Sequence, residues 1–466
     1  MKHIPLIISF IMPLLGGCVS INVDQDREHL MSESLVRTGK PVVWQETPKD
    51  QLHTQQAVRE LLKDGLLRDE AIRVALLNNQ TLQATFESLG IARADVVQAG
   101  LYSNPELGAL FRFPTSGATG TNVELDLLFR ISDLWNVPLR RNLAEVDAAR
   151  VTKLVIQDVL KTAARARDAF DDVLLQEAMH AFMTYNVRLF QTTVEELHVR
   201  FHAGLVNDLD IYLAKNILYD GHVELARIHS HLLTARARLA ETLGLDPLSL
   251  SALEVNGNLE DMPIRKISPT QSWKFAKAQR IDLQLAQLQI TQTQKLLSLQ
   301  KARIFGDVGL GGNYARELDG IRSTGPLLVL QIPIFDQNQA GIARAEFQLR
   351  QAQKNYDATQ LSAKQEIQRL VGELTFHETH VNLFRDKMLV GQQQALSYVE
   401  RFYATMQLNS IFLIEARRQI LNTRRGYFQA LRAYRQTESM LQLALGGELP
   451  KRWKSEQRDN SIAVNE

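Results

Sequence analysis

Two pairs of histidines have a spacing at which a helix can present both imidazoles to one metal ion. His198 and His202 lie four residues apart, and His377 and His380 lie three apart. Neither pair fits the spacing and glutamate placement of the metalloprotease motif, and no third ligand stands nearby in the sequence. Solvated histidines on helix faces explain both pairs better. The sequence therefore predicts neither a metal site nor a bound cofactor.

Other arrangements that would support catalysis are incomplete. Gly309, Gly311 and Gly312 suggest a phosphate-binding loop, but no lysine followed by serine or threonine comes next before a helix. Small residues within a strand explain these glycines better. We find no nucleophile motif and no serine–histidine–acid arrangement, so we expect that the protein is not an enzyme.

The one cysteine of the chain follows a short apolar stretch near the N-terminus. Residues 4–15 are apolar but too few to span a bilayer, and they lead into Leu15-Gly16-Gly17-Cys18. This pattern resembles the bacterial lipobox, which implies that residues 1–17 are a signal peptide and that Cys18 carries a covalent lipid such as palmitate. An ordinary signal peptide with an incidental thiol is the alternative. A lone cysteine also excludes an internal disulfide framework.

The net charge and the hydropathy of the chain limit its possible partners and its possible membrane spans. The 53 basic and 52 acidic residues leave a net charge of +1, so no overall basic field favours nucleic acid. No other apolar run approaches the ~20 residues of a membrane helix. Any membrane span must therefore be made of strands.

The chain repeats itself about two hundred residues along. The matching residues keep an offset between 201 and 203, whereas chance matches would scatter. The pairs are Leu82-Gln83 with Leu283-Gln284, Asp133 with Asp336, Arg141 with Arg344, Ala149 with Ala352, Arg200-Phe201 with Arg401-Phe402, and Leu243-Gly244 with Leu445-Gly446.

Each copy has two segments in which apolar and polar residues alternate with a period of two. In the first copy these lie near residues 105–130, where Leu125 and Leu127 oppose Glu124 and Asp126. In the second copy we expect strands over 305–314 and 327–334, joined by a loop. Each segment has roughly the 9–11 residues of a tilted membrane strand with one apolar face.

Helical spacing fills most of the remainder. A helix of roughly 65 residues would be near 100 Å long, far beyond an ordinary globular helix, so neighbours must support it. The helices are expected over 66–102, 133–203 and 208–243 in the first copy, and over 272–302, 336–403 and up to Gly446-Gly447 in the second.

Four strands cannot close a barrel, and a bilayer does not tolerate an open sheet edge. If these strands span a membrane, several chains must build one barrel. Two chains would give eight strands and a filled interior, whereas three would give twelve strands and an aqueous lumen. The polar face, which we assign to that lumen, contains Glu124, Asp126, Asp307 and Asn313.

At this point the sequence resembles the TolC-type outer-membrane efflux factors, from Leu66 to Gly447. The resemblance rests on the duplication, on Arg200-Phe201-His202-Ala203-Gly204 followed by Asp210 and Ala214, on Gln98-Ala99-Gly100-Leu101 before Asn104-Pro105, and on Ile332-Pro333-Ile334-Phe335-Asp336. The Gln98–Pro105 phrase is nearer to the metal-resistance branch. The resemblance implies a homotrimer with a twelve-stranded barrel, a periplasmic α-helical tunnel, and passive export from an inner-membrane pump through a periplasmic adaptor protein.

In this family, acidic residues near the turns that close the tunnel form a constriction. Asp210 falls on one such position, and Glu415 takes another in the second copy, where Thr405 aligns with Gly204 and one residue is inserted. Both are therefore candidates for lining the aperture, six carboxylates per trimer. Such a ring would favour cations. Solvated charges on helix faces are the alternative.

The sequence thus predicts a mainly α protein with a membrane β-barrel contribution, built from a duplicated helix–hairpin–long helix–helix unit. We expect a lipid-anchored channel of the bacterial outer membrane that extends into the periplasm. A periplasmic coiled-coil scaffold lipoprotein is the alternative. The expected segments are a signal peptide at 1–17, an anchored segment at 18–65, copies at 66–245 and 271–447, a linker at 246–270 and a polar tail at 448–466.

Overall fold

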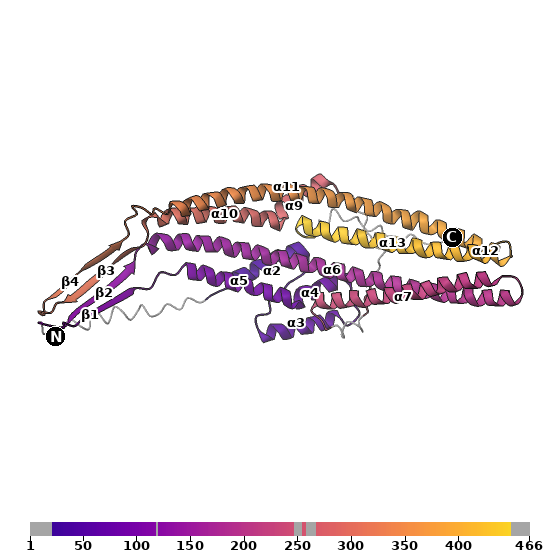
Figure 1. Cartoon of the computed structure of the whole chain (residues 1–466), viewed down its shortest axis with the longest axis horizontal. Coiled ribbons are helices and arrows are strands. Elements are labelled where there is room, and N and C mark those ends of the chain that lie inside the picture. Colours follow the sequence, from indigo (N-terminus) through magenta and orange to yellow (C-terminus); the bar gives the residue numbers. More distant parts are fainter. Residues whose placement is uncertain (1–20, 118–119, 247–253, 258–266, 449–466) are drawn as a thin grey trace. The chain divides into compact units, whose positions relative to one another are not determined.

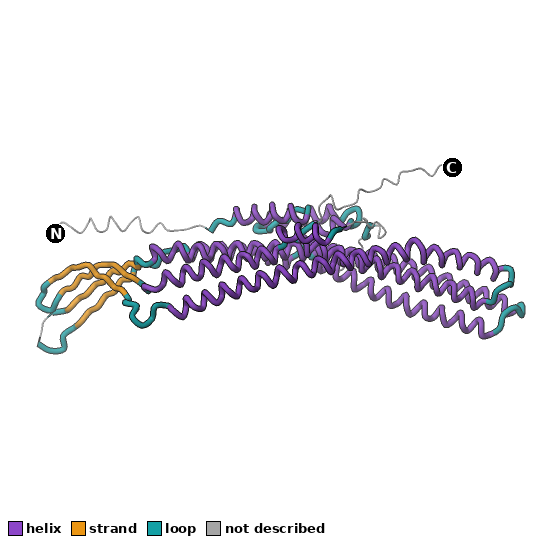
Figure 2. Tube along the Cα trace, turned by 90° about the horizontal axis from the view of Figure 1, so that it is seen from above, coloured by secondary structure: helices purple, strands orange, loops and turns teal. Residues whose placement is uncertain are grey.

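The computed structural model describes residues 21–117, 120–246, 254–257 and 267–448. These residues are mainly helical with one small sheet, which confirms the expected fold class (Figures 1 and 2). None of the described helices is at once long enough and apolar enough to cross a membrane.

One antiparallel sheet contains all the expected strands. These are β1 (Glu106–Arg112), β2 (Asn122–Arg130), β3 (Val308–Arg316) and β4 (Arg322–Leu330), and they pair in the order β1-β2-β3-β4. The central pair, β2 with β3, joins the two sequence copies and sets Asp126 opposite Asn313. The duplication therefore builds a single sheet from two hairpins.

The strands of the second copy begin and end at other residues than the alternation predicted. β4 begins at Arg322 and ends at Leu330, so the expected strand over 327–334 is wrong by several residues. Pro326 lies inside β4, which pairs only with β3, and an edge strand tolerates a residue that has no N–H to donate. The expected loop over residues 315–324 is also too long, because β3 extends to Arg316 and β4 begins at Arg322.

The long helix of the first copy is as expected, whereas its counterpart is divided. Helix α6 (Asp133–His202) has 70 residues and precedes α7 (Asp208–Leu243). The second copy has α11 (Gln339–Leu383), a π-helical turn η3 (Phe384–Met388), α12 (Leu389–Ala404) and α13 (Ser410–Leu445). At the π turn, a Cβ on Gly426 of α13 would lie 2.7 Å from the Phe384 ring, so this glycine leaves room for the phenyl group.

The helix before each hairpin is also divided, at equivalent positions in the two copies. Asn79 separates α4 (Arg68–Asn78) from α5 (Gln80–Ala99), and Arg280 separates α9 (Pro269–Gln279) from α10 (Ile281–Ala302). Asn79 Oδ1 accepts a hydrogen bond of 2.9 Å from the Leu82 N–H, as a helix-capping side chain does. The expected continuous helices over 66–102 and 272–302 are therefore corrected to two helices each.

The N-terminal segment has two helices that the apolar spacing did not predict. They are α2 (Asp24–Thr38) and α3 (Pro48–Leu61), the second with Thr47 and Asp50 forming a capping box. The guanidinium of Arg37 donates to the carbonyls of Gln279 (2.7 Å) and Gly446 (2.8 Å). Arg37 thus ties α2 to the last turns of two helices of the second copy.

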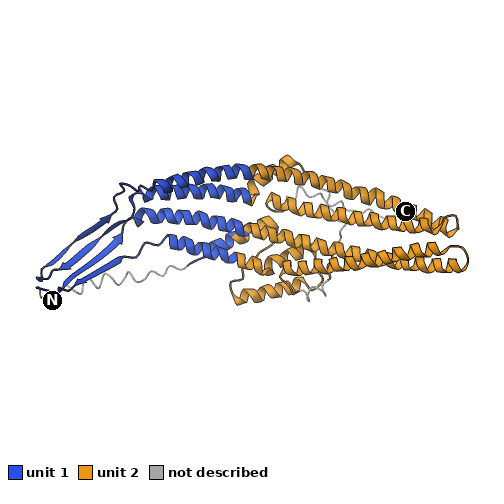
Figure 3. Ribbon diagram, in the orientation of Figure 1, with its two compact units in different colours: residues 1–29, 86–155, 282–359 blue, residues 30–85, 156–281, 360–466 orange. Residues whose placement is uncertain are grey.

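Two compact units divide the chain, and neither coincides with a sequence copy (Figure 3). Residues 86–155 and 282–359 hold the sheet and the helical segments next to it, while residues 156–281 and 360–466 belong to the second unit. In the second unit, α6 packs with α9, α11 and α13 in one hydrophobic cluster and with α7 in another. Each unit is therefore built from both copies, which accounts for the duplication as a shared core.

The turns that end the long helices show which residues correspond. In the first copy Gly204 has φ 74°, and its N–H donates to Phe201. In the second copy Met406 has the positive φ (59°), and its N–H donates to Tyr403 in the same way. The alignment of Thr405 with Gly204 is therefore wrong by one residue.

This correspondence predicts opposite effects of substitution at the two turns. A side chain at positive φ costs roughly 1–2 kcal/mol, partly offset by the entropy that glycine loses on folding. Gly204→Ala should therefore lower the free energy of unfolding by about 1 kcal/mol, and Met406→Gly should raise it by somewhat less. Thermal unfolding in detergent, followed by circular dichroism, measures both changes.

The neighbouring exposed residue provides the control. Gln407→Gly adds the backbone entropy that a glycine loses on folding but relieves no positive φ. It should therefore lower the free energy of unfolding slightly. Equal losses for Met406→Gly and Gln407→Gly would contradict the assignment of Met406 to the glycine position.

Candidate functional site

Polar side chains form a row of contacts across one face of the sheet. The partners come from β1, β2 and β3 and from Asp307 just before β3, and they lie on the face that Asp126 shares with its direct partner Asn313. The contacts are Arg112 with Glu124 (3.1 Å), Asn313 Nδ2 donating to Asp126 (2.6 Å), and Arg130 with Glu106 (3.3 Å) and with Asp307 (3.6 Å). The residues that alternation assigned to one polar face therefore do lie together.

The opposite face of the sheet is apolar and exposed. Leu107 is 73% exposed and Phe111 54%, and Leu125, Leu310 and other apolar residues of this face are also exposed. A hairpin packed on its own protein would bury such side chains, as a half-buried soluble sheet does. In the described part of the chain, nothing covers this face.

The glycines of β3 are explained by the close approach of β2. A Cβ on Gly311 would lie 1.9 Å from the Leu127 carbonyl oxygen, and one on Gly309 would lie 2.9 Å from the Leu128 side chain. Gly311 therefore excludes a side chain, and one at Gly309 would have to displace the Leu128 side chain. This confirms that these glycines belong to a strand and not to a phosphate-binding loop.

Asp210 lies in the first turn of α7, and both of its carboxylate oxygens are engaged. The Asn207 N–H donates to its Oδ2 (3.2 Å), while its own N–H donates to Asn207 Oδ1 (3.1 Å), which is a capping box. Its Oδ1 accepts a hydrogen bond from the Ser410 hydroxyl at the start of α13. Asp210 thus joins the two copies where their last helices begin.

Glu415 lies one turn into α13 and has different partners. It is exposed, Gln419 Nε2 donates to its Oε1 (3.0 Å), and Arg418 lies 3.9 Å from its Oε2. The described hydrogen bonds and ion pairs of Asp210 and Glu415 do not join the two residues. Their role in an aperture therefore stays a prediction.

Further contacts occur near these turns, most of them between the copies, and no local sequence pattern indicated them. The Arg200 guanidinium of α6 lies 4.1 Å from the ring centroid of Tyr403 on α12, which is a cation–π contact. Arg417 of α13 donates to the Thr193 hydroxyl on α6 and lies 3.4 Å from Glu400 on α12. Burial raises the pKa of Tyr403, so its ring stays neutral beneath the cation. We name these contacts, with that of Asp210 and Ser410, the tip network.

The remaining sequence predictions fall on packing residues or on undescribed ones. His377 and His380 lie against the Phe376 ring, with centroids 5.3 and 5.4 Å away. His202 lies 5.9 Å from Phe201. Among the described residues, no three His, Cys, Asp or Glu gather in a group that could hold a metal ion. Cys18 and the preceding Leu15, Gly16 and Gly17 lie outside the described residues.

Comparisons with known proteins agree with this architecture. Residues 274–447 match the family described as outer membrane efflux protein. The chain is 21% identical over 387 residues to the cobalt-zinc-cadmium resistance protein CzcC of Cupriavidus metallidurans, covering 82% of this chain and 90% of that one.

Solved structures show the same fold. The chain superposes on CusC with a TM-score of 0.68 and 16% identity, over 82% of this chain and 92% of that one. It superposes on the outer membrane protein VceC of Vibrio cholerae with a TM-score of 0.67 and 18% identity, over 82% of this chain and 96% of that one. The family match thus lies in the second copy, and the solved efflux channels show the same fold over both copies.

Proposed function

We propose that this protein is an outer-membrane channel subunit that passively exports small molecules or ions for an efflux system. The observation that carries the proposal is the four-stranded sheet, with an exposed apolar face, a polar face and one open edge at each end. Exposed apolar side chains suit lipid, while the row of charges on the other face suits water. The scaffold alternative requires covered hairpins, and no described contact supports it.

The open edges make assembly necessary in this proposal. β1 and β4 each pair on one side only within the described residues, and hydrocarbon offers no partner to the remaining backbone groups. Three chains would supply twelve strands and an aqueous lumen lined by Asp126 and its neighbours. We propose a homotrimer on this ground, anchored through a lipid on Cys18, and fed by an inner-membrane pump through a periplasmic adaptor protein.

The relatives suggest a class of cargo. CzcC is named for resistance to cobalt, zinc and cadmium, which favours divalent metal ions among the possible cargoes of this chain. In this proposal the metal ion is transported and is not a resident cofactor. The protein makes and breaks no covalent bond of its cargo.

The direct test of the channel is assembly and conductance. Multi-angle light scattering of the detergent-extracted full chain should give three protein masses, and planar bilayers containing it should conduct ions. A stable monomer that leaves bilayers insulating would refute the proposal.

A second test concerns the apolar face of the sheet. Leu125→Arg and Leu310→Arg place a charge on that face, and each should cost about 2–4 kcal/mol if the residue faces lipid near the bilayer midplane. Unfolding in lipid vesicles by guanidinium measures the loss. Ser323→Arg is the matched control, because Ser323 pairs with Ala315 on the opposite face of the sheet. Equal small effects at all three positions would argue that the apolar face is not in lipid.

We further propose that Asp210 and Glu415 line the narrow end of the channel. The tip network supports a closed resting arrangement. Its contacts of Arg200 with Tyr403, Arg417 with Thr193 and Asp210 with Ser410 join helices of the two copies, and they must break if these helices separate. Three Asp210 and three Glu415 side chains would form rings that attract cations and repel one another at short range.

Substitution of the two carboxylates should separate their roles. Glu415→Ala should lower cation selectivity in single-channel recording without loss of stability, because Glu415 is exposed. Asp210→Ala should lower selectivity, raise the open probability, and cost about 1 kcal/mol through the lost capping box. Arg369→Ala, at an exposed ion pair on α11, is the control and should change neither property. Unaltered conductance and selectivity in both test variants would reject the aperture assignment.

A further inference from the structure

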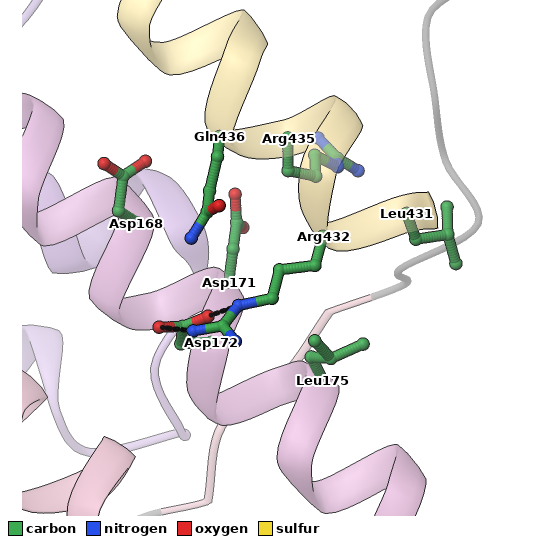
Figure 4. Close-up of a pocket in the computed structure, with 8 residues that line it drawn as sticks. All are labelled: Asp168, Asp171, Asp172, Leu175, Leu431, Arg432, Arg435 and Gln436. Atoms are coloured by element: carbon green, nitrogen blue, oxygen red, sulfur yellow. Dashed lines mark hydrogen bonds and ion pairs between the residues drawn. The ribbon is translucent and has the colours of Figure 1, made fainter. Parts of the chain in front are cut away.

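Three carboxylates crowd one and a half turns of α6, where this helix meets α4 and α13. They are Asp168, Asp171 and Asp172 (Figure 4), and arginines from other helices hold two of them. Arg68 of α4 donates to both oxygens of Asp171 (2.9 and 2.6 Å). Arg432 of α13 does the same to Asp172 (2.8 and 2.9 Å). These two bidentate pairs fix both arginines.

Asp168 has no arginine of its own in this arrangement. Its Oδ1 is buried and has no hydrogen-bond partner, while the adjacent Arg167 donates to Gln442 of α13. The hydroxyl of Ser439 on α13 is the group that favours its charged form most. A carboxylate with one oxygen shut off from water and this little compensation is costly, whereas the protonated form costs less.

Water has a route to this carboxyl. Asp168 and Asp172 line an open cavity of about 490 Å³, together with polar residues of α6, α7 and α13. The charged and titratable groups around Asp168 are Arg68 on α4; Arg165, Arg167, Asp171 and Asp172 on α6; Arg238 and Glu241 on α7; and Arg432, Arg435 and Glu438 on α13. A small separation of the helices would therefore hydrate the carboxylate.

We propose that Asp168 makes the junction of α4, α6 and α13 a pH-sensitive joint, packed when this carboxyl carries its proton and loosened when the proton leaves. The helices α6 and α13 belong to different copies, so loosening frees the last helix of the second copy to move against the first. The joint depends on contacts within one chain, and therefore stands or falls separately from the channel proposal.

The direction of the pH dependence follows from the environment. Burial raises the pKa of Asp168 from its ordinary 3.8 to about 6, with a further rise from the Asp171 carboxylate and an opposing effect of Ser439. The packed state thus binds the proton more tightly than an opened state. Packing is strongest below pH 3.8, weakens as pH rises, and is weakest above pH 6.

Hydrogen exchange of the intact, full-length protein in detergent tests the joint. With pKa values of about 6 packed and 3.8 opened, the opening equilibrium of residues 160–175 and 430–442 should rise about tenfold from pH 5 to pH 7.5. Each measured exchange rate is divided by the intrinsic exchange rate at the same pH, so that only the change in the opening equilibrium remains. Asp168→Asn mimics the protonated carboxyl and should abolish the rise while keeping exchange slow.

Two further variants make the test specific. Asp158→Asn removes an exposed carboxylate of the same helix, paired with Lys161 at 3.2 Å, and should keep the tenfold rise. Ser439→Ala removes the hydroxyl that favours the charged form and should move the midpoint to higher pH. A tenfold rise that survives in Asp168→Asn, or no rise in the unaltered protein, would overturn the proposal. If the protein is a trimer in detergent but its opening equilibrium does not rise with pH, the joint is rejected and the channel proposal stands.

Discussion

Backbone groups at the two open edges of the sheet are the constraint on which the rest of the structure depends. β1 and β4 each leave one row of N–H and C=O groups unpaired within the described chain. In water such a row is a liability, and in hydrocarbon it is not sustainable. In the proposed homotrimer, other copies of the same sheet would satisfy these groups by extending one ladder until it closes. The exposed apolar face of the sheet is also suited to hydrocarbon.

The long helices are stabilised by a different interaction, the packing of one copy against the other. The first copy supplies α6 and α7, and the second supplies α11, α12 and α13, yet the hydrophobic clusters mix residues of both. Polar contacts along α13 add specificity to this packing. Arg432 binds Asp172, Arg425 lies 2.5 Å from Glu224, and Arg417 reaches Thr193. In the second compact unit, helices of the two copies therefore pack together and do not form one domain per copy.

These polar contacts also give the helices a means of moving. Two-state separation requires contacts that can break at modest cost, and partly exposed ion pairs contribute less than a buried apolar core. The tip network and the Asp168 junction are of this polar kind, while the apolar residues Leu431 and Tyr434 of α13 are fully buried. The fold therefore combines a rigid apolar seam with polar contacts that respond to charge.

The sequence by itself determined the repeat, the alternation of the strands and the 70-residue helix α6, because each is a periodic local pattern. The resemblance to efflux factors placed Asp210 and Glu415 near the turns, and the structure has them within the first two turns of α7 and α13. Only the tertiary structure showed that Asp210 is bound by Ser410, that Met406 takes the glycine position, and that Pro326 lies within a strand. These features depend on contacts with residues two hundred positions away in the sequence, or on an edge strand that tolerates a missing N–H. The partners of Asp168 come from three helices, so no local pattern could have identified them.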